Sequence, residues 1–183
     1  FSTAVGQAAC RKLLEADFLS DAERPGWQDA SAQALTLVDA AFKRHGAPQI
    51  LRIHGDFHPG NVMWREVSAG DQGPHVVDLD DACNGLAVQD LWMLLAGDSP
   101  SMREQLEHVL AGYRVFRSFD AREAWLVEPL RTLRMIAYSA WIAERWHDPA
   151  FPAAFPWFGT PFYWSQQTVQ LREQIELMRD PPA

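Results

Sequence analysis

Lysine is almost missing from this chain, which holds only Lys12 and Lys43 among its 183 residues. Neither lysine lies in a Val-Ala-Ile-Lys-like strand, and the sequence has no G-x-G-x-x-G or G-x-x-x-x-G-K-[ST] loop. Lysines and glycine-rich loops of these kinds are the groups that hold nucleotide phosphates. The sequence therefore offers no self-contained lobe that could grip a nucleotide.

Cysteine and long apolar runs are also scarce. Cys10 and Cys83 stand far apart without a C-x-x-C pair, which argues against a disulfide framework or a structural zinc and predicts two reduced, structural thiols. Arg, Glu or Asp interrupts the apolar stretches well before the ~20 residues that a membrane-spanning helix needs. No charged-then-apolar leader opens the chain. We therefore expect a cytoplasmic protein with no membrane partner.

Positive charge is in deficit, because 16 basic residues face 24 acidic ones and give a net charge of -8. This balance argues against nonspecific nucleic-acid binding. The hydrophobic content of 48% allows a sizeable core, and 183 residues fit one domain better than two.

Hydrophobic periodicity predicts an α+β fold that is mainly helical. Apolar residues recur at helical spacing over 27–45, with Gly46 and Pro48 as stop signals. Three short β-rich runs follow, and the last two are expected to form a hairpin through turn residues 69–74: 49–53, 61–64 and 75–79. Helical spacing returns in four later segments: 88–96, 102–116, 121–146 and 163–178. The Pro- and aromatic-rich segment 147–161 is too apolar for disorder and should pack down.

The segment His54-Gly55-Asp56-Phe57-His58-Pro59-Gly60-Asn61 lies between the first two predicted strands, and Asp78-Leu79-Asp80-Asp81 follows at the end of the third. An Asp five residues before an Asn, with another Asp beyond a hairpin, is the arrangement by which kinases place a base and two metal ligands. The sequence therefore predicts one half of a phosphoryl-transfer site, carried by a short β-hairpin.

Each residue of this pattern has an expected role. Asp56 is the candidate carboxylate that orients the attacking hydroxyl, while Asn61 and Asp78 supply oxygen atoms suited to Mg²⁺. His54 is expected to hold the loop through hydrogen bonds rather than to react. Asp and Asn are also common turn residues, so the prediction depends on the joint pattern and not on any single residue.

Three further acidic residues have two interpretations each. Asp80 and Asp81 could contact metal or substrate, or could be solvated or cap a helix. Asp90 opens a predicted helix, where it could be a favourable charge at the N-terminus or could hold the catalytic loop.

His58 suggests a rival function, because His54-x-Asp56-x-His58 resembles the alternating ligands of zinc or di-iron hydrolases. A metal-dependent hydrolase would need further ligands. The other histidines lie in no comparable motif: His45, His75, His108 and His147.

These residues resemble the aminoglycoside phosphotransferase and choline kinase superfamily, whose motif runs much like His54-Gly55-Asp56 to Asn61 followed by Val77-Asp78-Leu79-Asp80. More closely, the chain is similar to the bacterial stress response kinase A family. This likeness covers nearly the whole chain and is carried by several segments: Val77–Ala82, Asn84-Gly85, Val88–Leu95, Glu128–Arg131, Asp148–Pro152 and Phe155-Pro156-Trp157.

The resemblance implies a protein-kinase-like fold of which residues 1–183 are the C-terminal lobe. It implies a cytoplasmic, ATP- and Mg²⁺-dependent kinase that phosphorylates protein Ser or Thr in stress responses. By that likeness Asp56 is the base, Asn61 and Asp78 are the Mg²⁺ ligands, and Asp90 steadies the catalytic loop. The family's N-terminal lobe, with its ATP-anchoring Lys, has no counterpart in this sequence. The chain begins with Phe1 rather than Met, so we expect that lobe upstream and an inactive isolated chain.

The phosphate acceptor stays open at this point. The acidic balance suits a basic protein segment, or a cationic small alcohol such as an aminoglycoside or choline-like molecule. A non-catalytic pseudokinase or interaction module is the alternative outside the enzyme classes.

Overall fold

The computed structural model of the chain describes residues 2–65, 73–97 and 99–179. The fold is mainly helical with small antiparallel sheets, which confirms the predicted α+β class. It comprises two compact units. The first is built from residues 1–46 and 128–183, and the second from residues 47–127.

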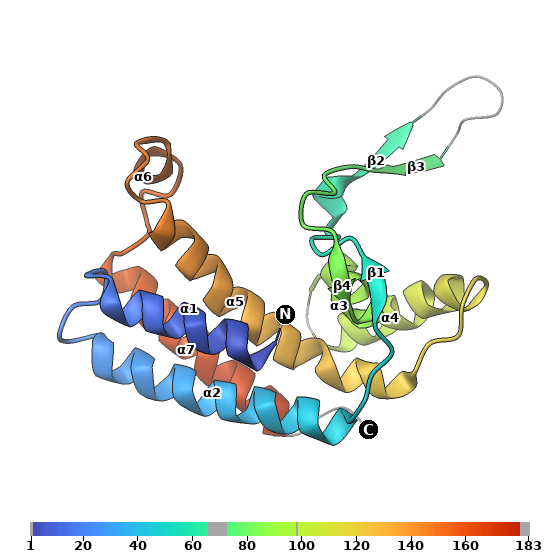
Figure 1. Cartoon of the computed structure of the whole chain (residues 1–183), viewed down its shortest axis with the longest axis horizontal. Helices are drawn as coiled ribbons and strands as arrows, with labels where there is room; N and C mark the ends of the chain where they lie inside the picture. The colour runs from blue at the N-terminus through green and yellow to red at the C-terminus, as the bar shows by residue number, and fades with distance from the viewer. Residues whose placement is uncertain (1, 66–72, 98, 180–183) are drawn as a thin grey trace. The chain divides into compact units, whose positions relative to one another are not determined.

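Helices form the first unit (Figure 1), and their bounds are as follows: α1 Thr3–Glu15, α2 Arg24–His45, α5 Val127–Glu144, α6 Ala150–Ala154 and α7 Pro161–Arg179. The first residue of α5, Val127, belongs to the second unit. Helix α2 packs against both α1 and α7. Helix α1 was not predicted. The predicted helix 27–45 is confirmed as α2, which begins three residues earlier because a proline occupies its first turn, and ends at Gly46 with a φ of 83°.

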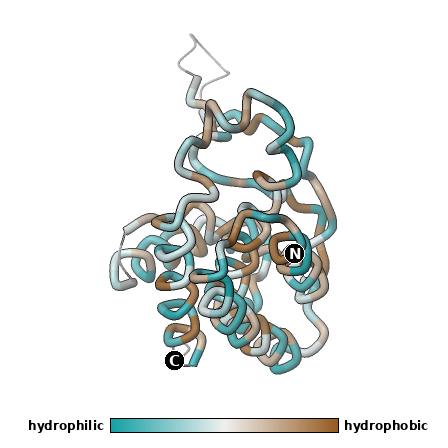
Figure 2. Tube along the Cα trace, turned by 90° about the vertical axis from the view of Figure 1, so that its left-hand side faces the viewer, coloured by the Kyte–Doolittle hydropathy of each residue, from teal (hydrophilic) through white to brown (hydrophobic). Residues whose placement is uncertain are grey.

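The core of the first unit lies where these helices meet. Leu13, Trp27 and Trp164 are 0% exposed, and each large apolar side chain buried in this way stabilises the fold by ~1.5–3 kcal/mol. The rings of Trp27 and Trp164 meet edge to face with centroids 5.7 Å apart, and the indole nitrogen of Trp164 donates to the carbonyl oxygen of Phe18 over 2.7 Å. Figure 2 shows hydrophobic and hydrophilic stretches alternating along the helices, as one-sided burial requires.

The aromatic segment 147–161 packs down in part, because Phe158 is buried and Phe151 and Phe155 are half-buried against the core, while Trp157 and most other residues of the segment are exposed. Phe158 is 3% exposed and lies with its ring centroid 5.1 Å from that of Phe18 and 5.6 Å from that of Trp164. The short helix α6 in this segment was not predicted. Among the described residues, no helix combines the length and apolar character needed to cross a membrane.

Both cysteines are thiols in the structure. Burial raises the pKa of Cys10 to about 11, so its thiol stays protonated and unreactive near neutral pH.

The described residues of the second unit form two small antiparallel sheets, one 16-residue helix and several short helices: β1 Leu51–Ile53, η1 Pro59–Asn61, β2 Val62–Arg65, β3 Gly73–Val76, β4 Cys83–Gly85, α3 Ala87–Leu91, η2 Trp92–Leu94, α4 Ser99–Arg114 and η3 Ala121–Leu126. Strand β2 pairs with β3 in the register Val62↔Val76, which confirms the predicted hairpin. Strand β3 ends at Val76, before the predicted end at 79, and turn residues 69–72 lie outside the described part of the chain.

The structure differs from the predictions at other places as well. The predicted helix 88–96 is the short helix α3 followed by the 3-10 segment η2. Strand β4, which pairs with β1 in the register Ile53↔Cys83, was not predicted. The single helix expected over 121–146 is instead the 3-10 segment η3 followed by α5. Pro129 explains the break, because proline lacks the N–H that a helix interior uses and is tolerated only in the first turn.

Candidate active site

The loop from His54 to Asn61 joins β1 to β2 in the second unit. It begins with a sharp change of direction at Gly55, which has a φ of 89°. At this position a Cβ atom would overlap the carbonyl oxygen of Asp81 and lie 3.0 Å from its carbonyl carbon. The absence of a side chain at Gly55 therefore lets the loop pass directly against the segment that leads into β4.

Asp90, in helix α3, holds the start of this loop. Its Oδ2 accepts the backbone N–H of His54 at 2.7 Å, and its Oδ1 accepts the backbone N–H of Gly55 at 2.9 Å. The two oxygens of one carboxylate thus accept hydrogen bonds from consecutive backbone N–H groups. Such bonds to a charged acceptor are roughly twice as strong as hydrogen bonds between neutral groups. This geometry matches the loop-holding interpretation of Asp90 rather than that of a helix-terminal charge alone.

Helix α3 is itself held by a residue that sequence analysis missed. Glu123, 3% exposed, accepts the backbone N–H of Val88 with its Oε2 at 3.0 Å. Val88 lies in the first turn of α3, where backbone N–H groups lack partners within the helix. A buried glutamate in η3 therefore caps the helix that carries Asp90, and the sequence around Glu123 gives no local signal of this long-range contact.

The side chain of His54, the first residue of the loop, is buried, and both nitrogens of its ring have partners. Its Nε2 lies 2.8 Å from the carbonyl oxygen of Val77, and its Nδ1 accepts the backbone N–H of Asp56 at 3.3 Å. A single neutral tautomer, with the proton on Nε2, satisfies both bonds. The ring also lies against Phe57, with centroids 5.5 Å apart. Because a metal ligand must offer a nitrogen lone pair, this geometry speaks against the hydrolase interpretation of His54.

Asp56 and Asn61 are joined across the loop. The side-chain amide nitrogen of Asn61 donates to the backbone oxygen of Asp56 at 3.0 Å, and the backbone oxygen of Asn61 accepts the N–H of Val77 at 3.0 Å. The first bond fixes the orientation of the amide group, so Oδ1 is the atom of Asn61 suited to a cation. The second bond extends the hairpin by one residue and places Asn61 beside the residue that precedes Asp78.

Asp78 lies two residues beyond the end of β3 and has a φ of 63°, in the left-handed region that favours glycine. Asp and Asn enter this region more readily than other residues, at a cost of roughly 1–2 kcal/mol. Its side chain is exposed, as are those of Asp80 and Asp81 in the turn that follows. Asp81 approaches the loop through its backbone carbonyl at Gly55 rather than through its carboxylate.

The oxygen atoms offered by Asn61 and Asp78 are of the hard type that Mg²⁺ binds. Over the described residues, no group of three or more His, Cys, Asp and Glu side chains converges as a zinc or iron site would require. Asn61 Oδ1 and the Asp78 carboxylate are thus the groups of this loop and hairpin that could hold a hard cation.

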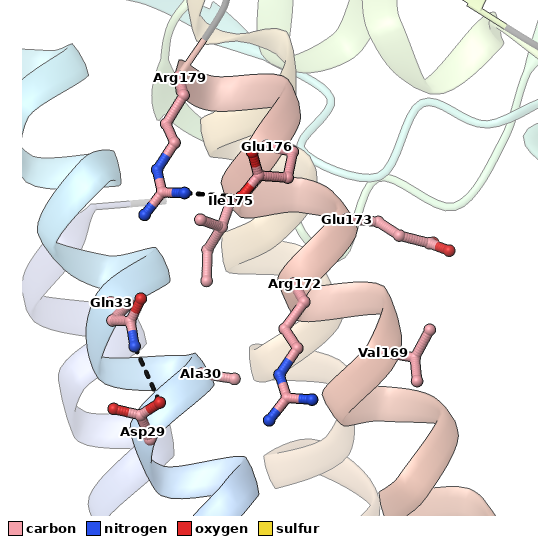
Figure 3. Close-up of a pocket in the computed structure, with 9 residues that line it drawn as sticks. All are labelled: Asp29, Ala30, Gln33, Val169, Arg172, Glu173, Ile175, Glu176 and Arg179. Atoms are coloured by element: carbon pink, nitrogen blue, oxygen red, sulfur yellow. Dashed lines mark hydrogen bonds and ion pairs between the residues drawn. The ribbon is translucent and has the colours of Figure 1, made fainter.

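A groove of about 420 Å³ lies in the other unit, between α2 and α7, and contains none of the predicted site residues (Figure 3). Its lining combines charges of both signs, and Arg179 pairs there with Glu176 at 2.6 Å while Gln33 donates to Asp29 at 2.8 Å.

The amino-acid sequence of the chain is similar to those of known proteins. The stress response kinase A of Escherichia coli K12 is 43% identical over 173 residues, and that of Shigella flexneri is 42% identical over the same length. A Salmonella typhimurium protein named serine/threonine protein kinase RdoA is also 42% identical. Each alignment covers 94% of this chain and 50% of the relative, so the chain spans about half the length of these curated relatives.

These identities confirm the resemblance to stress response kinases that the motifs indicated. The profile of the phosphotransferase enzyme family matches residues 7–153, which include the whole loop, the hairpin and helix α3. The chain belongs to the phosphotransferase enzyme family.

Proposed function

We propose that this chain is the catalytic half of an ATP- and Mg²⁺-dependent kinase that phosphorylates Ser or Thr side chains of a protein. The main support is the loop 54–61 in a chain of the phosphotransferase family, with its start held by Asp90 and with Asn61 bonded to Asp56. The name of one relative, a serine/threonine protein kinase, favours a protein acceptor over a small alcohol. Because the reaction consumes ATP, we place it in the cytoplasm.

Asp56 is the proposed base of this reaction. As the acceptor hydroxyl oxygen bonds to the γ-phosphorus of ATP, its proton moves to the Asp56 carboxylate, and the bond from that phosphorus to the bridging oxygen of ADP breaks. Asn61 Oδ1 and the Asp78 carboxylate would hold Mg²⁺, which when bound offsets the negative charge of the phosphates. The left-handed backbone of Asp78 supports its assignment, because costly conformations of this kind concentrate at functional sites.

The nucleotide-gripping lobe is, in this proposal, the upstream part of a longer protein. The relatives are about twice as long as the matched region, and residues 47–127, which carry the loop, contain no lysine. Lys12 pairs with Glu144, and Lys43 pairs with Asp39 at 2.5 Å, so both lysines are engaged on the surface of the first unit. The chain's first partner is therefore its own N-terminal lobe.

The test is transfer of labelled γ-phosphate from Mg-ATP by the full-length protein, with casein, choline and an aminoglycoside offered as acceptors. We expect label on Ser or Thr of casein and on neither small alcohol. Label on choline or the aminoglycoside instead would replace the protein-kinase proposal by a small-molecule kinase. No transfer to any acceptor, with Mg-ATP shown to bind, would overturn the catalytic proposal in favour of a pseudokinase.

The role of Asp90 can be tested separately from turnover, by amide hydrogen exchange in the chain itself. In Asp90→Asn the amide group has only one acceptor atom for two backbone donors, and a bond to a charged group contributes ~1.5–3 kcal/mol. We expect the amides of His54 and Gly55 to exchange at least about 10-fold faster than in the unaltered chain, which corresponds to ~1.4 kcal/mol.

Asp21→Asn removes the same charge at an exposed position and serves as the control. Unchanged protection of the two loop amides in Asp90→Asn would show that the carboxylate does not hold the loop.

A further inference from the structure

We propose that His58 is a positioning residue that orients the carboxylate of Asp56, an inference that rests on the proposed role of Asp56 as base. Its starting observation is the distance of 3.5 Å between Nε2 of His58 and Oδ2 of Asp56. Nothing in the sequence pattern distinguishes this use of His58 from that of a metal ligand or a loop residue.

The first step concerns the place of the His58 ring. His58 is the N-cap of η1, and its Nδ1 accepts the backbone N–H of Gly60 at 3.0 Å. The backbone of the same residue donates to the carbonyl oxygen of Asp56 at 3.0 Å and accepts the N–H of Asn61 at 2.9 Å. The backbone bonds therefore fix the turn on both sides of His58, and the bond from Gly60 to Nδ1 orients the ring independently of its contact with Asp56.

Gly60 makes this orientation possible. A Cβ atom at Gly60 would lie 2.7 Å from Cε1 and 2.9 Å from Nδ1 of the His58 ring, well inside van der Waals contact. The edge of the ring that carries Cε1 and Nδ1 thus lies close against a backbone that has no side chain at this point. A larger residue at 60 would displace it.

The second step concerns the proton. Because Nδ1 accepts a hydrogen bond from Gly60, the neutral ring carries its proton on Nε2, the atom that faces Asp56. His58 is consequently a donor toward the carboxylate and has no lone pair on that side with which to remove a proton from it. This tautomer excludes a relay in which the neutral ring takes the proton from Asp56 through Nε2. It also argues against a metal ligand, because Nε2 carries the proton and the lone pair of Nδ1 is used by the bond from Gly60.

The third step is the effect on Asp56. A donor this close to Oδ2 would, on forming a hydrogen bond, limit rotation of the carboxylate about its Cβ–Cγ bond and so set the direction in which the base meets the acceptor hydroxyl. The present distance is longer than an ordinary N–H···O bond, and catalytic hydrogen bonds commonly tighten only in the substrate complex. The side chain of Asp56 is 23% exposed and that of His58 is 40% exposed, so both are accessible to a substrate.

Two substitutions separate this role from that of a turn residue. Asn at 58 places a side-chain oxygen where Nδ1 now accepts from Gly60, and so keeps the cap, but has no donor that reaches Asp56. Gln at 58 is one bond longer and brings its amide nitrogen near the place of Nε2 while weakening the cap. We expect kcat of the full-length kinase to fall about 10-fold in His58→Asn and less than about 3-fold in His58→Gln, with KM for ATP unchanged in both.

Opposite ranking, with His58→Gln impaired and His58→Asn normal, would show that only the cap matters and would overturn the proposal. So would a normal kcat in both variants. Thermal unfolding of each variant identifies any loss of kcat that comes from a weakened fold.

A double-mutant cycle with Asp56→Asn completes the test. If His58 acts through Asp56, the combined variant is no slower than Asp56→Asn alone. A further 10-fold loss in the combined variant would show that His58 acts on another group. Activity retained by Asp56→Asn itself would instead refute the proposed base, and this outcome is distinct from failure of the His58 proposal, in which Asp56→Asn is inactive and His58→Asn is normal.

Discussion

Asp56→Asn in the full-length protein should lower kcat by about 10²–10⁴-fold, which is the contribution that a positioned acid or base typically makes. The substitution preserves the shape of the side chain and removes its ability to take the acceptor's proton. It should leave the fold intact, because three hydrogen bonds of the loop use the backbone of Asp56 rather than its carboxylate: those with His54 Nδ1, the His58 N–H and the Asn61 side chain.

The measurement is the rate of labelled phosphate transfer, paired with a melting temperature for each protein. Asp21→Asn, exposed in the first unit, is the control for loss of one negative charge. Turnover equal to that of the unaltered protein would remove Asp56 from its role. A loss of turnover that accompanies a large drop in melting temperature would point to the fold instead of the chemistry.

Gly55→Ala is the second substitution with a large expected effect. The new Cβ atom has to adopt the left-handed backbone at a φ of 89°, which costs roughly 1–2 kcal/mol, and in addition overlaps the backbone of Asp81. Because the overlapped carbonyl group of Asp81 is part of the backbone, it cannot move aside as a flexible side chain would. We expect an unfolding free energy lower by about 2–5 kcal/mol and the loss of most phosphate transfer.

Gly46→Ala is the matched control, since Gly46 also has a positive φ, of 83°, but has nothing within 4 Å of where its Cβ would lie. Because Gly46 has a ψ of -125° and no neighbour to overlap, the alanine should cost only backbone strain, roughly 1–3 kcal/mol. Urea unfolding of the two variants beside the parent chain measures the difference. Equal destabilisation by both substitutions would mean that the contact between Gly55 and Asp81 does not constrain the loop.

The chemistry of the candidate site could be predicted from the sequence because it depends on residue types at short, fixed spacings. Asp56 and Asn61 lie in one loop, and Asp78 follows a hairpin that two short β-rich runs predict. The contacts that hold this loop could not be predicted. Glu123 meets the N-terminus of α3 across 35 residues, and such a bond between a side chain and a distant backbone group leaves no local pattern.

The fold shows the same division between local and distant information. Helix α2 has a buried face at helical spacing, a proline in its first turn and a glycine at its end, and each of these signals is local. Strand β4 consists only of Cys83, Asn84 and Gly85, of which the last two have low strand propensity, and it forms because β1 offers an antiparallel partner. Tertiary pairing thus overrides local preference there.

The helical unit has a consequence for synthesis of the protein, since its core joins the two ends of the chain. The indole of Trp164 bonds to Phe18 across 146 residues, and Trp27 packs against the same indole. The second unit is one continuous segment, 47–127, so it can fold as it leaves the ribosome. Helices α1 and α2 leave the ribosome before residues 47–127, yet the face of α2 that packs against α7 stays uncovered until α7 emerges, so this early part of the helical unit is among the last to become stable.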